Sequence, residues 1–503
     1  MSAATTIALS LISHTNAGKT TLARTLLGRD VGEVRDAAHV TTEASVHPLI
    51  DTAEGDALVL WDTPGFGNSA RLAARLSQQG NPIGWFLAQV WDRFRDRAFW
   101  LTQQAVRNVR ERADIVLYLV NASESPADAG YLAHELAVLD WTGKPVIALL
   151  NQMGPPRAPA EEAVEAARWR DALARWPQVQ RVIALDAFAR CWVQELTLFD
   201  AVAKALPAAK QPAFARLAGA WKTRRTAQFD AAMAALAPVI AEAACDRVML
   251  PPDPLLAKLG RSLGVARAPA DRAATVAERA MAARVEAGLR AATDRLLALH
   301  ELRGRAAADV LARVRGGVQR NAPMDEAKSA VMGGLVTGAL TGLTADLATG
   351  GLTLGGGMLA GAVLGALGGA GVARGLNVAN NRTDVTLTWS VPFLDALVVD
   401  AVLRYLAVAH YGRGRGDWHE GEYAPFWRDA ATAAVAAHAP ALAAIWSLRS
   451  PDCTPLQLEG PLCAALRAIT REVLAALYPE SNATGDVIGA ASTGPGDAPA
   501  HAS

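Results

Sequence analysis

One short stretch near the start of the chain constrains the fold more than any other feature. Between the apolar run 6–12 and the helical pattern 22–27 lie Ser13, His14, Thr15, Asn16, Ala17, Gly18, Lys19 and Thr20. A strand that leads through such a loop into a helix presents converging backbone N–H groups and the positive helix end to an anion. Gly18 permits the tight backbone of this loop. The stretch therefore predicts a phosphate-binding loop.

The side chains of this loop suit a nucleoside triphosphate. We expect Lys19 to bridge the β- and γ-phosphates and to stabilise charge during hydrolysis, and the Thr20 hydroxyl to ligate Mg²⁺. Thr21 opens the helix and joins Ser13 to Thr20 as an expected nucleotide contact.

Two further motifs occur in the order that this chemistry requires. Asp62, Thr63, Pro64 and Gly65 follow directly after an apolar run that ends at Trp61. We expect Asp62 to hold Mg²⁺ through water and the Gly65 N–H to sense the γ-phosphate. Thr42, in a polar loop before the second strand, completes the expected magnesium shell and orders its loop when the γ-phosphate is present.

The first 192 residues alternate short β-rich runs with helical patterns, which is typical of a doubly wound, mostly parallel α/β sheet. Several runs are almost entirely apolar, as expected of strands that are covered on both faces. The predicted strands are 6–12, 45–50, 57–61, 114–120, 145–150 and 181–185.

The remaining chain predicts a mostly α-helical domain, because 503 residues are too many for one core and alanine-rich helical patterns dominate from residue 193 onward. Its first part covers 193–328 and its second part 376–479. Residues 480–503 are small and polar and predict a disordered tail.

Residues 329–375 separate the two helical parts and predict a glycine-rich helical hairpin. Between Lys328 and Arg374 only Asp346 is charged, and glycines recur at every fourth residue. That spacing lets two helices approach closely. Two interpretations remain open: a hairpin that inserts into or lies on the inner membrane, and a packed helical pair in a soluble domain.

Aromatic residues recur at helical spacing in the segment 82–112. One interpretation is a helix that packs its aromatic side chains on the first domain. The other is a helix that transmits nucleotide state to a partner or to the second domain.

Composition excludes some classes of protein. Lys plus Arg and Asp plus Glu both number 49, so the charge balance indicates no specific nucleic acid partner. The four cysteines are far apart in sequence and predict reduced thiols. The N-terminus lacks a signal-peptide pattern, which favours a cytoplasmic protein.

Together these motifs resemble the translation-factor-related GTPases of the Era, TrmE and EngA branch. In particular, the SHTNAGKTTL, DTPGF and NQMG stretches and the glycine-rich segment resemble bacterial GTPases that carry domain of unknown function 3482. The resemblance implies GTP and Mg²⁺ as ligands, K⁺ bound with the help of Asn16, and a dimer through the G domains. It also places Phe66 where Ras-like proteins have a water-orienting glutamine, so we expect slow intrinsic GTP hydrolysis.

Guanine recognition in such proteins rests on an Asn-Lys-x-Asp motif, and this chain departs from it. Asn151 is present, but Gln152 replaces the lysine and Gly154 replaces the aspartate. The last base-contacting loop includes Asp186 and Ala187. Asp186 either compensates for the missing carboxylate or caps the following helix.

The sequence thus predicts a slow, Mg²⁺-dependent GTPase that acts as a nucleotide-controlled switch. It would be cytoplasmic or associated with the cytoplasmic face of the inner membrane through 329–375. Two alternatives stay open: a nucleotide-gated membrane or scaffold protein with negligible hydrolysis, and an ATPase.

Overall fold

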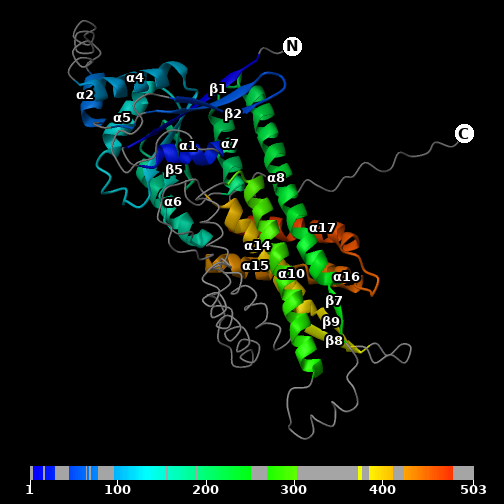
Figure 1. The fold of residues 1–503 in the computed structure, drawn as a ribbon. Helices are drawn as coiled ribbons and strands as arrows, with labels where there is room; N and C mark the ends of the chain where they lie inside the picture. The colour runs from blue at the N-terminus through cyan, green and yellow to red at the C-terminus, as the bar shows by residue number, and fades with distance from the viewer. Residues whose placement is uncertain are drawn as a thin grey trace, which may run out of the picture.

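The structure is a computed structural model, and Figure 1 shows its fold. It describes residues 4–14, 17–28, 45–63, 65–66, 69–77, 96–154, 157–186, 191–250, 269–302, 372–376, 385–411 and 424–479.

A six-stranded sheet forms the centre of the N-terminal domain. Its strands are β1 (Thr6–Ser13), β2 (Ser45–Asp51), β3 (Ala57–Asp62), β4 (Ile115–Asn121), β5 (Val146–Asn151) and β6 (Val179–Ala184). They lie in the order β2-β3-β1-β4-β5-β6, with β2 antiparallel to β3 and all other neighbours parallel. The six predicted strands and the mostly parallel, doubly wound fold are confirmed.

Helices cover both faces of this sheet because the side chains of each strand alternate between two apolar cores. The first core joins Ile115, Leu117 and Leu119 to α1 (Lys19–Leu27) and α7 (Trp192–Ala205). The second core takes the intervening side chains of β4. It includes α2 (Ser69–Ser77), α4 (Arg97–Arg112), α5 (Leu132–Thr142) and α6 (Pro159–Leu173).

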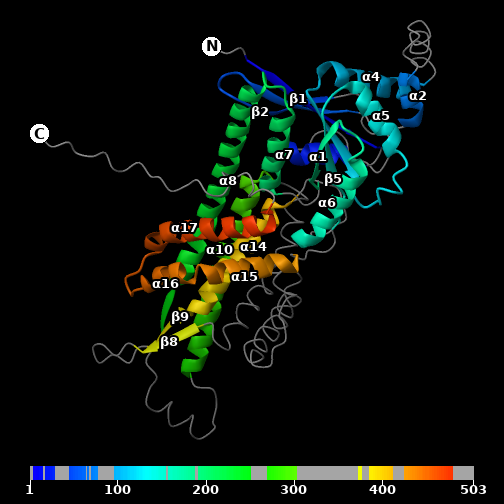
Figure 2. The same ribbon diagram turned by 180° about the vertical axis from the view of Figure 1, so that it is seen from behind.

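Helix α8 (Gln211–Cys245) connects the two halves of the molecule. Its first turns, including Phe214 and Trp221, belong to the first core of the sheet, whereas Phe229 and the apolar residues after it belong to a separate core in the C-terminal half. At 1.5 Å per residue its 35 residues extend about 50 Å. Figures 1 and 2 show it running from the strands to the C-terminal helices. One continuous helix therefore contributes to both cores.

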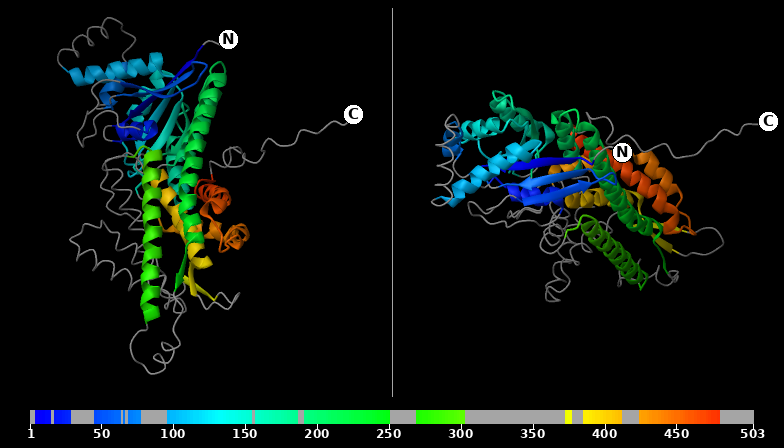
Figure 3. Two further views of the ribbon diagram at one scale, coloured as in Figure 1. Left: turned by 45° about the vertical axis from the view of Figure 1, so that its right-hand side comes forward. Right: turned by 90° about the horizontal axis from the view of Figure 1, so that it is seen from above.

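The C-terminal half is mostly helical. Around α8 lie α10 (Pro269–Leu299), α14 (Val391–Ala409), α15 (Pro425–Ala437), α16 (Ala439–Ser447) and α17 (Pro455–Leu477). Figure 2 shows α15, α16 and α17 lying across the long pair α8 and α10, and Figure 3 shows these three helices, in orange and red, on one side of that pair. A small antiparallel sheet, β7 (Arg247–Leu250), β9 (Val385–Trp389) and β8 (Val372–Leu376), lies at the far end.

One expectation from the sequence needs correction, and two features of the structure were not predicted. Residues beyond the predicted domain boundary at 192 contribute to the first core, because α7 and the start of α8 pack there. The boundary itself stays a prediction. The glycine-rich helical hairpin cannot extend to 375, since 372–376 form β8; the rest of that segment lies outside the described residues. The small sheet was not predicted at all.

The aromatic segment 82–112 is described only from residue 96 onward. There α4 packs against α5, and Phe99 is buried in the second core of the sheet. Figures 1 and 2 place α4 at the end of the molecule away from the C-terminal helices. Its described part therefore supports packing on the first domain rather than contact with the second.

Among the described residues, α8 has the length and apolar composition to cross a membrane, and the bent pair α15–α16 passes the same test as a unit. In α8, however, 61% of the most apolar window is buried inside the protein. A buried core helix meets the same criteria, so this observation gives no support for membrane insertion.

Candidate functional site

The predicted site residues meet at one edge of the large sheet because the parallel strands all end there. Leu11 of β1 pairs with Asp62 of β3, and Asn121 of β4 pairs with Asn151 of β5. Asp186 follows the end of the neighbouring strand β6. Loops at the carboxyl ends of such strands form the usual binding crevice of open α/β sheets.

The phosphate loop leads into α1 with a geometry suited to an anion. Gly18 is the N-cap residue and has a left-handed backbone, with φ of 81°. In the described chain no side chain caps this helix end, and its first turn contains no acidic residue. The N–H groups and the positive end of α1 are thus presented without a competing side-chain carboxylate on the helix itself.

Three polar side chains converge at the start of α1. Lys19 Nζ lies 3.1 Å from Asp62 Oδ1, and Thr20 Oγ1 donates to Asp62 Oδ2 at 3.0 Å. Asp62 is only 2% exposed. A hydroxyl and a carboxylate oxygen directed at one point are the hard ligands that Mg²⁺ prefers, so these residues fit the ion that we expect.

Gly18 also allows residues 151–154 at the end of β5, called the base loop below, to approach the phosphate loop. Asn151 Nδ2 donates to the Ala17 carbonyl at 2.7 Å, and Asn151 is fully buried. A Cβ atom on Gly18 would lie 2.5 Å from that same amide nitrogen. The Gln152 Nε2 atom would be 3.7 Å from this Cβ. Asn151 and Gln152 therefore bring the two loops into contact, and their role in binding a nucleotide stays a prediction.

His14 ties the phosphate loop to the second core. Its Nδ1 atom lies 2.6 Å from Oε1 of the fully buried Glu135, and Tyr118 donates to Glu135 Oε2 at 2.6 Å. The His14 ring stacks on Tyr131 at 4.1 Å. The hydrogen bond to Glu135 raises the pKa of His14, whereas burial raises the pKa of Glu135. We place the hydrogen of the His14–Glu135 contact on His14 Nδ1 rather than on Glu135, because both Glu135 oxygens then accept hydrogen bonds.

Phe66 cannot orient a water molecule. Its side chain is 1% exposed and packs in the second core with Ile12 and Leu72, while its N–H donates to the Ser13 carbonyl at 3.0 Å. Thr63 donates its hydroxyl proton to the Leu11 carbonyl, which holds the start of this loop. Gly65 follows at the surface of the same loop, half-buried.

The base loop has an unusual backbone and lies beside the carboxylate of Asp186. Gln152 and Gly154 both have positive φ, 58° and 82°. Asp186 is 6% exposed, and its Oδ2 atom accepts from the Met153 N–H at 2.6 Å. The alternative role of Asp186 as a helix cap is wrong for α7, whose N-cap is Cys191.

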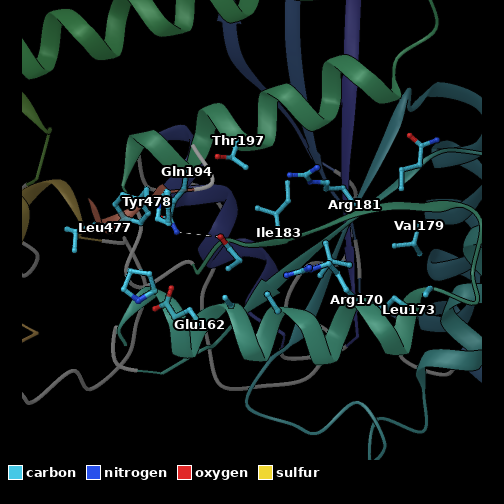
Figure 4. A pocket seen from close by; sticks show the side chains of 18 residues that line it. Glu162, Arg170, Leu173, Val179, Arg181, Ile183, Gln194, Thr197, Leu477 and Tyr478 are labelled. Carbon is cyan, nitrogen blue, oxygen red and sulfur yellow. Dashed lines mark hydrogen bonds between the residues drawn. The ribbon is translucent and has the colours of Figure 1, made fainter. Parts of the chain in front are cut away.

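One cavity adjoins this loop, and a second lies beside the first. One of about 40 Å³ is lined by the base loop, Asp186 and Glu162, and by C-terminal residues that include Trp427 and Tyr478. A larger one, about 380 Å³, runs along the edge strand β6. Figure 4 shows Glu162 at the same end of this larger cavity as Tyr478, with Arg170 and Arg181 farther along it. Glu162 and Tyr478 line both cavities.

Several predicted site residues lie outside the described residues: Thr15, Asn16, Thr42 and Ala187. Their roles stay predictions. Conversely, sequence reasoning missed Glu135, Tyr118 and Glu162. Nothing in their local sequence marks them, because a lone acidic residue in a helix is usually solvated. In the part of the chain that the structure describes, no cluster of three His, Cys, Asp or Glu suggests another metal site.

Fold and site together define a P-loop nucleotide-binding protein of the GTPase class. Residues 9–152 match the family model described as 50S ribosome-binding GTPase. Residues 170–437, more than half of the chain, match the model for domain of unknown function 3482. The chain belongs to the family that this domain defines, and its N-terminal domain is that of a GTP-binding protein.

Similarity to solved structures is low. Era from Aquifex aeolicus bound to GDP and aluminium fluoride is 18% identical with a TM-score of 0.30; the match covers 40% of this chain and 57% of Era. Era in complex with MgGDPNP and nucleotides of 16S ribosomal RNA is 18% identical with a TM-score of 0.30, and the match covers 41% of this chain and 58% of Era. A structure of the chloroplast translocon components atToc33 and psToc159 is 13% identical with a TM-score of 0.26, and the match covers 37% of this chain and 72% of that chain. This chain thus spans a little over half of each Era chain, and TM-scores this low carry no conclusion. The search of curated proteins found no match.

Proposed function

We propose that this protein is a slow, Mg²⁺-dependent GTPase whose nucleotide state controls its helical domain. One observation carries the proposal: Lys19 and Thr20 both contact Asp62 at the start of α1, which no side chain caps in the described chain. When the γ-phosphate enters, the Lys19 ammonium leaves Asp62 and bridges the β- and γ-phosphates, and the N–H groups of the loop hold the oxygens between them. Gly65 contacts the γ-phosphate through its N–H.

Thr20 and Asp62, with Thr42, would hold Mg²⁺. The ion neutralises phosphate charge when it is bound. Because Phe66 is buried, this loop supplies no side chain to orient the attacking water at that position. Slow intrinsic turnover follows, and K⁺ held near Asn16 or a second G domain would supply the missing charge stabilisation.

Helix α8 supports a switch. Any movement of its first turns against the sheet reaches the C-terminal core through one rigid element. Trp192 extends this link, because its Nε1 donates to the Tyr405 hydroxyl at 3.0 Å. We further propose a cytoplasmic protein that associates with the inner membrane through 329–375.

The test is phosphate release by purified protein in K⁺ against Na⁺, with Mg²⁺ present. Slow release that K⁺ accelerates, and that Lys19→Ala and Asp62→Ala remove, supports the proposal. Binding of GTP without measurable release favours the alternative of a nucleotide-gated scaffold. Fractionation with high-salt and carbonate washes tests the membrane part, which complete release into the soluble fraction would refute.

The replacement of the guanine-reading aspartate by Gly154 favours one second candidate, an ATPase. Competition between labelled GTP and ATP separates the two, and a clear preference for ATP would remove GTP from the proposal.

A further inference from the structure

Glu135 of α5 is fully buried, and the phosphate chemistry proposed above does not use it. A buried carboxylate costs free energy unless hydrogen bonds satisfy its oxygens. Its two partners come from different elements: His14 of the phosphate loop donates to Oε1 at 2.6 Å, and Tyr118 of β4 donates to Oε2 at 2.6 Å. Short hydrogen bonds to a charged acceptor are among the stronger ones in proteins. Glu135 therefore fixes His14 relative to the sheet.

A second contact restrains the His14 ring from its face. The ring stacks on Tyr131, with centroids 4.1 Å apart and an angle of 15° between the planes. Tyr131 is the N-cap residue of α5, and its hydroxyl donates to Glu124 Oε2 at 3.3 Å. A hydrogen bond at the ring edge and a stack on the ring face thus both attach His14 to the start of α5.

The backbone of His14 lies where the phosphate loop meets the loop after β3. His14 forms an isolated parallel bridge with Phe66, and the Phe66 N–H donates to the Ser13 carbonyl at 3.0 Å. Phe66 directly follows Gly65, whose N–H is the proposed contact to the γ-phosphate. The phosphates that GDP also carries depend instead on the N–H groups that lead into α1. The position of His14 therefore affects the γ-phosphate more than the other two.

We infer that Glu135 is a positioning residue for the γ-phosphate: through His14 it holds Gly65 in register with the phosphate loop, so that the site distinguishes GTP from GDP. This inference rests on the proposed function, because it requires that the site binds guanine nucleotides. The role of Glu135 is indirect, since both of its oxygens are bonded to protein groups.

Glu135→Ala in the full-length chain removes the attachment of His14. The assay is displacement of a fluorescent GDP, with Mg²⁺ present, by GDP or by a non-hydrolysable GTP analogue. We expect affinity for the GTP analogue to fall at least about tenfold and affinity for GDP to fall at most about threefold. Glu135→Gln keeps a carbonyl acceptor for His14 and should stay within about threefold of the wild type for both ligands.

His14→Ala breaks the same contact from the other side. Its side chain is 37% exposed, so this variant decides the question if Glu135→Ala does not fold. It should show the same selective loss. The double variant should bind the GTP analogue no more weakly than either single variant, because Glu135 acts only through His14.

Asp140→Asn changes an exposed carboxylate on the same helix and is the matched control, which should leave both affinities unchanged. Circular dichroism and urea unfolding establish that each variant is folded. Equal losses for GDP and the GTP analogue, or no loss, in folded His14→Ala or Glu135→Ala would overturn the inference. If the wild type binds both ligands equally, the inference alone fails; if it binds neither, the proposed function fails.

Discussion

Replacing Gly18 by alanine tests the contact between the phosphate loop and the base loop, and Gly28 provides a matched control. Both glycines flank α1 and both have a left-handed backbone, with φ of 81° and 68°. They differ in surroundings. A Cβ atom on Gly18 would lie 2.5 Å from Asn151 Nδ2, whereas one on Gly28 would meet nothing within 4 Å.

The expected magnitudes follow from this difference. A left-handed L-residue costs about 1–2 kcal/mol, and both variants share that cost. In Gly18→Ala the buried Asn151 amide must also move off the Ala17 carbonyl, to which it donates at 2.7 Å. A buried polar group deprived of its partner costs a further ~1–3 kcal/mol. We therefore expect the free energy of unfolding to fall by about 2–5 kcal/mol for Gly18→Ala and by about 1–2 kcal/mol for Gly28→Ala.

Urea unfolding of both variants without nucleotide measures these losses, and titration with GTP measures affinity. Gly18→Ala should also weaken GTP binding, while Gly28→Ala should not. If Gly18→Ala is no less stable than Gly28→Ala, the close approach of Asn151 to the loop is wrong.

Two other perturbations act on buried polar groups away from the phosphate loop. His410 is fully buried, with Nδ1 2.7 Å from the Leu406 carbonyl and Nε2 bonded to the Tyr478 hydroxyl, and burial lowers its pKa from 6.5 to about 4. The pKa of His410 is lower in the folded than in the unfolded protein, so its contribution to the free energy of unfolding is fully present above about pH 6.5. That contribution is lost as the pH falls toward 4, by about 2 kcal/mol between pH 7 and pH 5. Urea unfolding at both pH values should show this slope in the wild type and a shallower one in His410→Gln; equal slopes would contradict the assignment. Glu195 is 1% exposed and accepts hydrogen bonds from Trp221 and Arg225 of α8, so Glu195→Ala should cost about 3–5 kcal/mol. Asp200→Ala, which removes a more exposed pair on the same helix, should cost under about 1 kcal/mol; similar losses would refute the role of Glu195.

The sequence predicted the strands of the large sheet because their signals are local. Runs such as 115–120 are wholly apolar, and the turns between them lead directly into helical patterns. The same local logic placed Lys19, Thr20 and Asp62 together, since parallel strands end at one edge.

The parts that the sequence did not predict depend on contacts between distant residues. Strand β8 arises in a segment of glycine and alanine, where tertiary pairing with β9 overrides a helical composition. Glu135 and His14 are 121 residues apart, and only the fold reveals that they meet. Helix α8 contributes apolar residues to both cores, and no change in composition along the helix indicates where one core ends and the other begins.

Calorimetric titration of the full-length protein with GTP and Mg²⁺ tests the central claim, that the loop around Lys19 and Asp62 holds a triphosphate. We predict saturable binding that needs Mg²⁺ for full affinity and that disappears in folded Lys19→Ala. Absence of heat with any purine triphosphate, or binding that is unchanged in Lys19→Ala, would contradict it.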